Sequence, residues 1–315
     1  MEDIIQEKLI KNILDPVPLE VIEKITYQMK KCVCQIYING ETGTGVFTKI
    51  PYKHQLLKVL ITAHHVLGEN EIKNNKIITI SLNNNEKDKK HIKMNNKRKR
   101  YTNDIFDVTI IEIDEIQDNI HDFIELDDEI INSMKLSKME IIDNFKDIYN
   151  NKSIYILNYL NGENIVVSYG LLTEINEENG INHKCNTSKG SSGSPILSLK
   201  NNKLIGIHYG GSRNYDYNNG TLIIYPIIEF QKNIKNNNIL IIKKEKNDKL
   251  NSMTILYNIK DKNRIKLFGS KFIENNKNNC KIIIEKKDQD LIEYLDINQN
   301  MKNKEILEIK LKEIK

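Results

Sequence analysis

The sequence predicts an all-β protein with a helical N-terminal leader and a small C-terminal module of mostly β-structure. Apolar residues recur at helical spacing up to residue 31, and short apolar or alternating runs replace that pattern from residue 32 onward. Residues 235–246 are rich in Asn and Lys, as linkers often are. We therefore expect a leader at 1–31, a main domain at 32–234, a linker at 235–246 and a module at 247–315.

The leader contains two helical patterns, which Asp15-Pro16 and Pro18 separate. The apolar positions of the first pattern are Ile5, Leu9, Ile10 and Ile13. Those of the second pattern are Val21, Ile22, Ile25 and Met29.

The main domain consists of many short strands, an arrangement typical of an antiparallel sandwich or barrel. The expected strands are Cys32–Ile38, Gly45–Ile50, Leu56–Thr62, Lys76–Leu82, Asp107–Ile113, Ile154–Tyr159, Ile165–Ile175, Ser194–Leu199, Leu204–His208 and Thr221–Tyr225. A short helix over Pro226–Ile234 is expected to close the domain. The expected strands of the C-terminal module are Met253–Ile259, Ile265–Phe268, Lys281–Glu285 and Ile306–Ile314.

Composition excludes little about the protein's partners. The 315 residues are 39% apolar, which allows a sizeable core, and the formal net charge of +4 does not require a nucleic-acid partner. A basic run extends over Lys87–Arg100, and Asp88 is its only acid. We interpret this run as a solvated loop between strands in preference to an anion-binding patch.

The four cysteines indicate a reducing compartment. Cys32 and Cys34 alternate on one strand, a spacing at which a disulfide does not form easily, and Cys185 and Cys280 lie far apart in the sequence. The N-terminus lacks the basic and apolar regions of a signal peptide, and no run is apolar enough to span a membrane. The expected location is cytoplasmic, with free thiols.

The segment Gly190-Ser191-Ser192-Gly193-Ser194-Pro195 carries the strongest chemical signal. A serine hydroxyl becomes a useful nucleophile when a base removes its proton and donors stabilise the oxyanion that forms. The flanking glycines allow a tight turn, in which the Gly190 and Ser192 N–H groups would form that oxyanion hole. The alternative is an ordinary Gly/Ser-rich turn between strands.

Two further segments supply candidates for a base and for a group that orients it. His64 and His65 follow a strand and a small-residue turn, and no Cys or carboxylate lies nearby at a metal-ligand spacing. Asp107 stands at the head of an apolar strand, where its carboxylate could accept a ring N–H. Asp104 and Asp114 are alternatives to it. The chain order His, Asp, Ser is that of the chymotrypsin-type triad.

Together these segments resemble the trypsin-like serine peptidase family, and within it the glutamyl endopeptidase branch. The resemblance covers about residues 32–234 and implies two antiparallel six-stranded barrels with the active site between them. It selects His65 over His64 as the base, beside Asp107 and Ser192. The stretches that carry it are Gly43–Phe47, Thr62–Val66, Asp107–Ile111, Gly190–Pro195 and Gly206–Gly211.

The resemblance also implies where the substrate binds. Glutamyl endopeptidases hold an acidic side chain with a His in the Gly-Ile-His strand and a Thr five positions before the nucleophile, which here are His208 and Thr187. Tyr209 and Gly210 complete the expected substrate-binding strand. Ser191 stands where secreted trypsins have the Asp that pairs with a newly cut N-terminus, so their zymogen switch is expected to be absent.

The sequence therefore predicts a serine endopeptidase that acts on polypeptides and needs no cofactor and no metal. We expect no membrane or nucleic-acid partner, and contact with another protein through the C-terminal module. Two alternatives stay open. One is a catalytically silent scaffold with a peptidase fold, and the other is an anion binder that acts through the basic run.

Overall fold

The computed structural model divides the chain into two compact units, residues 1–230 and residues 231–315. Each unit is described by itself. The structure describes residues 13–52, 55–74, 77–83, 89–95, 98–176, 180–212, 216–235, 239–247, 250–259, 263–285, 287–298, 301 and 306–313.

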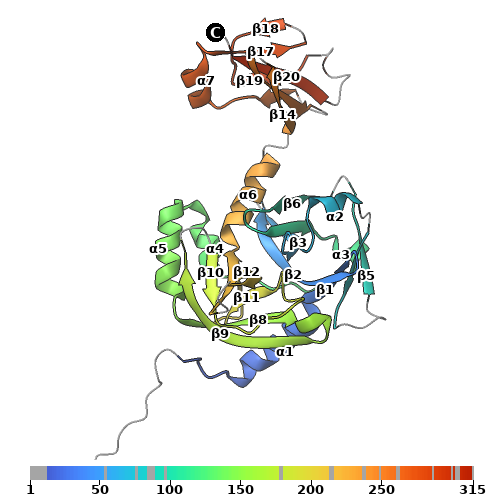
Figure 1. Cartoon of the computed structure of the whole chain (residues 1–315), viewed down its shortest axis with the longest axis vertical. Coiled ribbons are helices and arrows are strands. Elements are labelled where there is room, and N and C mark those ends of the chain that lie inside the picture. The colour runs from blue at the N-terminus through green and yellow to red at the C-terminus, as the bar shows by residue number, and fades with distance from the viewer. Residues whose placement is uncertain are drawn as a thin grey trace, which may run out of the picture. The chain divides into compact units, whose positions relative to one another are not determined.

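The first half of unit one forms a seven-stranded antiparallel sheet with the strand order β5-β4-β1-β2-β3-β7-β6 (Figure 1). Its central strands correspond to the runs of alternating apolar residues in the sequence. The bounds are β1 Val33–Ile38, β2 Glu41–Tyr52, β3 Gln55–Thr62, β4 Ile77–Ser81, β5 Lys89–Lys93, β6 Arg100–Asn103 and β7 Val108–Glu112.

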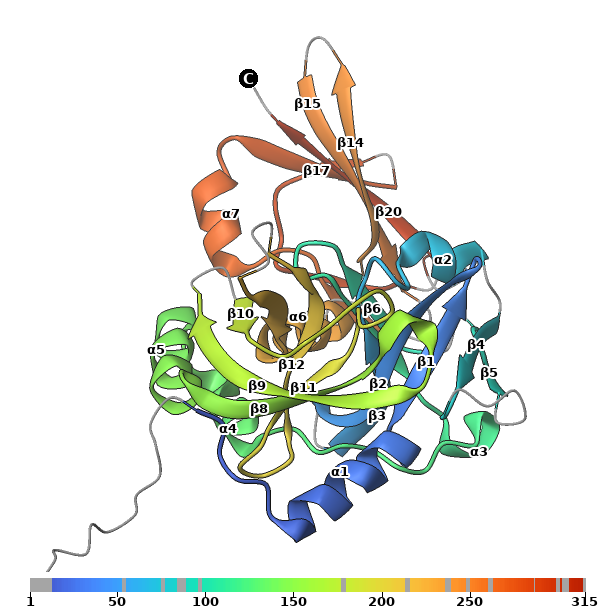
Figure 2. The same cartoon turned by 60° about the horizontal axis from the view of Figure 1, so that its bottom comes forward.

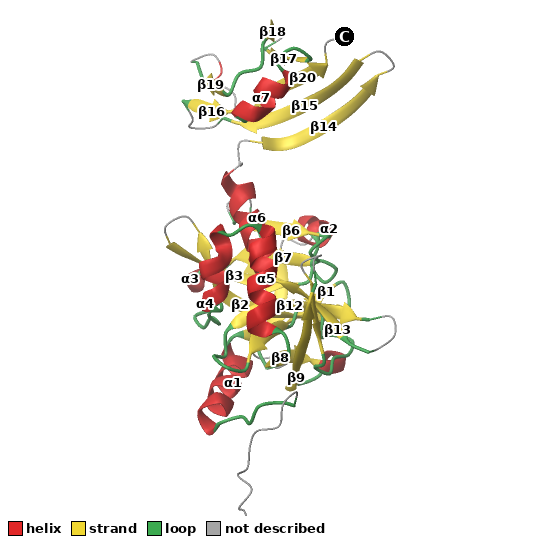
Figure 3. Ribbon diagram, turned by 90° about the vertical axis from the view of Figure 1, so that its left-hand side faces the viewer, coloured by secondary structure: helices red, strands yellow, loops and turns green. Residues whose placement is uncertain are grey.

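The second half forms a closed six-stranded barrel in the order β10-β13-β12-β11-β8-β9 (Figure 3). Its strands are β8 Lys152–Tyr159, β9 Ile165–Ile175, β10 Gly180–His183, β11 Pro195–Ser198, β12 Leu204–Gly211 and β13 Asn218–Leu222.

The expectation of two six-stranded barrels is correct only for the second half. In the described part of the chain, no pairing joins the edge strands β5 and β6, so the first half is an open sheet of seven strands. The strands β5, β6 and β10 were not expected, because polar residues fill them. Only Ile92 in β5 and Tyr101 in β6 are buried, so neither strand shows an apolar alternation.

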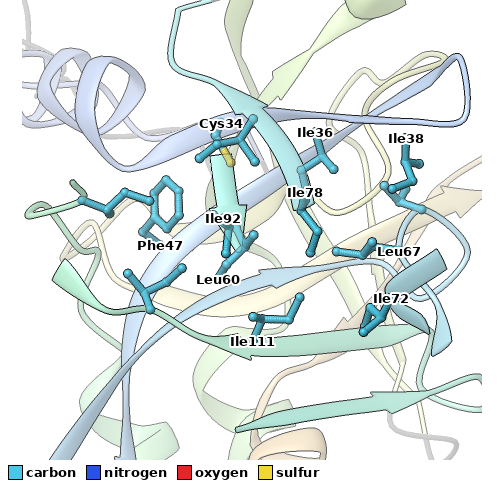
Figure 4. Packing of buried hydrophobic residues seen from close by; sticks show 14 of the residues in the cluster. Cys34, Ile36, Ile38, Phe47, Leu60, Leu67, Ile72, Ile78, Ile92 and Ile111 are labelled. Atoms are coloured by element: carbon cyan, nitrogen blue, oxygen red, sulfur yellow. The ribbon is translucent and has the colours of Figure 1, made fainter. Parts of the chain in front are cut away.

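Buried aliphatic side chains between the strands of the first sheet form one core cluster (Figure 4). Cys34, Ile36, Phe47 and Leu60 are fully buried in this cluster. Burial of one such side chain stabilises the fold by about 1.5–3 kcal/mol. This cluster keeps β2 and β3 rigid, and both strands lead to the functional site.

The helix α1, Leu19–Lys31, packs on the outside of unit one beside β8 and β9 (Figure 2). It confirms the second helical pattern of the leader. Within it the side chain of Gln28 is buried; its Nε2 donates to the Asn202 carbonyl at 2.8 Å and its Oε1 accepts from the Tyr155 hydroxyl at 2.6 Å. The first pattern lies outside the described residues except for Ile13, which is exposed and not helical.

Further helices lie between the strands of unit one. They are α2 Glu69–Asn74, α3 Glu115–Asp118, α4 Asp128–Asn132 and α5 Lys138–Tyr149, and α6 Ile224–Lys235 follows β13. A capping box between Ser137 and Glu140 begins α5. The helix α6 confirms the closing helix expected over Pro226–Ile234. Among the described residues, no helix is both long and apolar enough to cross a membrane.

Unit two contains a five-stranded antiparallel sheet in the order β14-β15-β20-β17-β18 and a two-stranded sheet of β16 and β19. Its core is a cluster of aliphatic residues around the buried side chain of Tyr257. Its elements are β14 Ile239–Asn247, β15 Leu250–Asn258, β16 Arg264–Lys266, α7 Ser270–Asn276, β17 Cys280–Ile284, β18 Lys287–Gln289, β19 Tyr294–Asp296 and β20 Ile306–Glu313.

Most of the segment interpreted as a linker is a strand. Residues 239–247 form β14, which pairs with β15 through a register that ends at Asn247 opposite Leu250. The Asn and Lys content of 235–246 concealed this strand, because those residues are rare in strands and common in loops. The strands β18 and β19 and the helix α7 were also not expected.

We predict that Gln28→Ala destabilises unit one, because the substitution removes two buried hydrogen bonds and leaves the Asn202 carbonyl without that donor. The expected loss is about 2–4 kcal/mol of unfolding free energy, measured by urea denaturation. Gln117→Ala, at an exposed position, is the control and should change that energy by less than about 0.5 kcal/mol. Equal stability of the two variants would contradict a structural role for α1.

Candidate active site

The loop 188–194 lies between β10 and β11 and is fixed to both halves of unit one. The Gly193 N–H donates to the His208 carbonyl and the His208 N–H donates to the Ser194 carbonyl, both at 2.8 Å, which holds the loop beside β12. From the first sheet, the Thr44 N–H donates to the Ser192 carbonyl at 2.8 Å. Ser192 therefore lies where the open sheet meets the closed barrel.

Each of the four carbonyl oxygens from Lys189 to Ser192 accepts at least one hydrogen bond. The Lys189 carbonyl accepts from the Asn161 N–H at 2.7 Å, and the Gly190 carbonyl accepts from the Thr44 hydroxyl at 2.7 Å. The Ser191 carbonyl accepts from the Ser194 N–H at 3.0 Å and from its hydroxyl at 2.6 Å. The Ser192 carbonyl accepts from Thr44, as described above.

The N–H groups of the same peptides divide into two kinds. Those of Ser191 and Gly193 donate to the Ser188 and His208 carbonyls. Those of Gly190 and Ser192 donate to no acceptor among the described residues. The Gly190 N–H shares a peptide group with the Lys189 carbonyl, and the Ser192 N–H shares one with the Ser191 carbonyl. Because N–H and C=O point in opposite directions in a trans peptide, the bonds to these carbonyls turn both N–H groups to the other side. The two expected oxyanion-hole donors are thus both available.

Glycine is required at two positions of this loop. Gly190 has φ +92°, and a Cβ there would lie 2.5 Å from the Tyr159 carbonyl oxygen. Gly193 has φ +91°, and a Cβ there would lie 2.0 Å from the Thr44 carbonyl oxygen. Both the left-handed backbone and the close approach of a neighbouring strand exclude a side chain.

The structure brings His65 and Asp107 into direct contact. The Asp107 Oδ2 lies 2.6 Å from His65 Nδ1, and Oδ1 accepts from the His65 backbone N–H at 2.8 Å. The two bonds fix the imidazole with Nδ1 protonated and Nε2 available. The hydrogen bond to Asp107 raises the pKa of His65 above its ordinary value, against the opposing effect of burial.

Asp107 is held in an uncommon backbone conformation. Its φ is +49°, in the left-handed region that Asp tolerates better than most residues. The Thr221 hydroxyl donates to the neighbouring Phe106 carbonyl at 2.6 Å, which ties this turn to the barrel. The alternatives Asp104 and Asp114 do not contact His65: Asp104 accepts the Asp107 N–H through its carbonyl, and Asp114 caps α3.

His64 points away from this site. Its Nδ1 lies 2.8 Å from the Thr102 hydroxyl on β6.

Among the described residues, no group of three or more His, Cys, Asp or Glu side chains could hold a metal ion. The buried thiols do not compete as nucleophiles, because burial raises the pKa of Cys32 to about 12 and also raises those of Cys34 and Cys185.

The backbone next to Ser192 lies close to the segment that precedes His65, but the Ser192 hydroxyl is not bonded to His65. The Cβ position of Gly193 is 3.0 Å from the Ala63 backbone nitrogen, two residues before His65. Within the described residues, Ser192 Oγ is bonded only to the Tyr209 carbonyl, at 3.5 Å, a long contact. The preceding residue Ser191 is fully buried, and its hydroxyl donates to Asn158 at 3.0 Å.

The expected substrate-binding residues follow the loop along β12. His208 is buried, and Tyr209 and Gly210 are half-buried at a bulge in the pairing of β12 with β13. Thr187 is half-buried, and its hydroxyl makes no hydrogen bond among the described residues. Burial lowers the pKa of His208 to about 4.

A second buried histidine, His183 on β10, adjoins His208. His183 Nε2 lies 3.3 Å from His208 Nδ1, and the Cys185 N–H donates to His183 Nδ1 at 3.3 Å. Burial lowers the pKa of His183 to about 3, and His208 adds to that shift. The sequence pattern offered no signal for His183, because only the barrel order β10-β13-β12 brings these strands together.

The basic run Lys87–Arg100 is largely structural where the structure describes it. Arg98 is buried and forms two hydrogen bonds with Asp118, at 2.7 and 3.0 Å, and Lys99 pairs with Glu112 at 2.6 Å. Parts of the run form β5 and β6 instead of one loop. Lys87, Asp88 and Lys97 lie outside the described residues.

Solved structures with a similar fold include a serine endoprotease from Yersinia pestis and the tobacco etch virus protease. The first is 10% identical over 95% of this chain and 100% of its own, with a TM-score of 0.49. The second is 15% identical over 66% of this chain and 78% of its own, with a TM-score of 0.41. No curated protein matches the chain.

The family model of the trypsin-like peptidase domain matches residues 43–207, more than half of the chain. The matched segment contains the His65–Asp107 pair and the loop that carries Ser192. This chain therefore belongs to the trypsin-like peptidase domain family.

Proposed function

We propose that the protein is a serine endopeptidase in which Ser192 is the nucleophile, His65 the general base and Asp107 the residue that orients the base. The observation that carries this proposal is the hydrogen bonding of the loop 189–193, in which carbonyl groups have partners and two N–H groups have none among the described residues. The carbonyls from Lys189 to Ser192 all accept hydrogen bonds, while the Gly190 and Ser192 N–H groups are left available beside a serine hydroxyl.

In the proposed reaction, Ser192 Oγ attacks the carbonyl carbon of the scissile peptide while His65 Nε2 accepts the hydroxyl proton. The oxyanion of the tetrahedral intermediate accepts hydrogen bonds from the Gly190 and Ser192 amides. The C–N bond then breaks, and His65 returns the proton to the leaving amine. Water repeats the sequence on the acyl-enzyme and releases the acid.

The long contact between Ser192 Oγ and Tyr209 describes the free protein. Rotation about χ1 of Ser192 is needed to bring Oγ to His65, and catalytic hydrogen bonds often tighten only when substrate binds. The same contact is the observation that favours the alternative, a peptidase fold that binds polypeptides without cleaving them.

A peptide library distinguishes these two functions. We expect the intact chain to cleave a mixed library, with cut sites read by mass spectrometry, and to react with a fluorophosphonate probe. Ser192→Ala should abolish both, because the neighbouring hydroxyls of the loop, those of Ser191 and Ser194, are buried and donate to Asn158 and to the Ser191 carbonyl. Ser168→Ala on β9 is the matched control and should retain both. Cleavage or labelling that persists in Ser192→Ala would refute the assigned nucleophile, and an inert intact chain would favour the binding function.

The pH dependence of kcat/KM should report His65. Cleavage needs neutral His65, whose pKa is raised, so kcat/KM should fall as the pH drops through a midpoint above 6.5. In Asp107→Asn the largest cause of that shift is removed, so the midpoint should move down and kcat should decrease by about 10⁴-fold. The control is Asp104→Asn, in the same turn, which should leave both quantities unchanged. An unchanged midpoint in Asp107→Asn would exclude Asp107 as the orienting residue.

We further propose that the pocket at His208 and Thr187 prefers an acidic residue at the position before the cut. The Cys185 N–H makes His183 Nδ1 an acceptor, so Nε2 carries the proton and donates to His208 Nδ1. This order leaves the proton of neutral His208 on Nε2, from which it can donate to a carboxylate. A further proton on Nδ1 completes an imidazolium when the His183 N–H gives up its bond to that nitrogen. A carboxylate that enters the pocket would stabilise this cation.

This preference predicts a proton uptake that can be measured. His208 is neutral in the free protein at neutral pH, and a bound carboxylate should raise its pKa from about 4, whereas an uncharged amide should not. The ratio of kcat/KM for matched Glu and Gln peptides should therefore increase as the pH falls from about 8 to 5.5, where Glu stays ionised. The ratio cancels the titration of His65.

His208→Gln should remove this pH dependence, and His121→Gln, at an exposed position in the first half of unit one, should preserve it. A Glu-to-Gln ratio that stays constant or decreases as the pH falls would contradict the acidic preference and leave the triad proposal intact.

A further inference from the structure

Thr44 bonds to three other segments of unit one: the loop 188–194, the end of β8 and the end of β3. Thr44 lies on β2 and is fully buried. Its hydroxyl donates to the Gly190 carbonyl at 2.7 Å and accepts from the Tyr159 N–H at 3.3 Å. Its own carbonyl accepts from the Thr62 hydroxyl at 2.7 Å.

These contacts connect the oxyanion loop with the strand that leads to His65 and with the segment that precedes Asn161. Thr62 ends β3, three residues before His65. Tyr159 ends β8 and precedes Asn161, whose N–H holds the Lys189 carbonyl. Gly190 supplies one of the two oxyanion-hole donors. A single buried hydroxyl thus bonds to the oxyanion loop and to the segment that anchors the loop from the other side.

The loop needs such an anchor because Gly190 has great conformational freedom. A glycine rotates about its backbone bonds at little cost, so the peptide groups on either side of Gly190 could turn and point a carbonyl into the hole. Two bonds prevent this: Asn161 N–H on the Lys189 carbonyl and Thr44 Oγ1 on the Gly190 carbonyl. Of these two bonds, only the one from Thr44 comes from a side chain. The Thr44 hydroxyl is buried, so water does not compete for the Gly190 carbonyl there.

We propose that Thr44 is a positioning residue for the oxyanion hole. It fixes the Gly190–Ser191 peptide, which lies between the two peptides that carry the Gly190 and Ser192 N–H groups, so that both donors keep their direction. Thr44 contacts neither His65 nor the substrate-binding residue His208 through a hydrogen bond. Its loss should therefore impair the stabilisation of the transition state without changing the base. This inference rests on the proposed peptidase function.

The test compares Thr44→Val with Thr48→Val. Thr48 lies on the same strand, is equally buried, and donates its hydroxyl to the Ile124 carbonyl over the same 2.7 Å. Both substitutions remove a 2.7 Å bond to a carbonyl, and Thr44→Val also removes the longer 3.3 Å bond from the Tyr159 N–H. Both should therefore lower the melting temperature, Thr44→Val by somewhat more. Only Thr44→Val should lower kcat, by about 10–10³-fold, with little change in KM and no shift of the pH midpoint that reports His65.

Thr44→Ser restores the hydroxyl and should recover kcat to within a few-fold of the unsubstituted chain. A kcat within about three-fold of the unsubstituted chain in Thr44→Val would overturn the proposal. An equal loss of kcat in Thr48→Val, or a Thr44→Ser variant as impaired as Thr44→Val, would also overturn it, because each outcome indicates a general packing effect.

A second readout separates this inference from the proposed function. With ¹⁵N-glycine and carbonyl-¹³C-lysine labelling, the 14 glycines give one amide signal each, and Gly190 is the glycine coupled to a labelled lysine carbonyl, because Lys189-Gly190 is the one Lys-Gly step in the sequence. Thr44→Val should shift or broaden that signal and Thr48→Val should not. An unperturbed Gly190 signal in Thr44→Val overturns the positioning role even in a chain that cleaves nothing. A perturbed signal in such a chain supports the role in the loop while the peptidase function fails.

Discussion

The functional site depends on one constraint, which is that every carbonyl of the loop around Ser192 must be held away from the place where an oxyanion would form. A peptide group presents a donor on one side and an acceptor on the other, so an amide faces the site only if its carbonyl has a partner elsewhere. Those partners come from three different segments: the turn after β8 at Asn161, strand β2 at Thr44 and the loop itself at Ser194.

Two imidazoles of the site have their pKa values moved in opposite directions by their surroundings. His65 is half-exposed and bonded to a carboxylate, which raises its pKa, whereas His208 is buried beside another histidine, which lowers its pKa to about 4. At neutral pH the first is suited to exchange a proton with substrate, and the second stays neutral until a charged ligand arrives. Their different roles follow from burial and partners, since the residue type is the same.

Some of the fold could be predicted from the sequence and some could not. Strands such as β1, β3 and β8 are apolar, and their runs located them within a few residues. The strands β5, β6, β10 and β14 contain Lys, Arg, Asn or His, and β5 and β6 each have one buried side chain, so pattern alone missed them. Closure of a barrel is equally invisible in the sequence, because it depends on how the edge strands pair.

By itself the sequence supplied the candidates for the proposed chemistry. They were the His64-His65 pair, Asp107 with Asp104 and Asp114 as alternatives, and the Gly190–Gly193 turn. Only the tertiary structure decided between His64 and His65 on physical grounds, by placing one beside Thr102 and the other beside Asp107. It alone revealed His183 and the part played by Thr44. These residues act through contacts between segments remote in the chain, and such contacts leave no local periodicity or motif in the sequence.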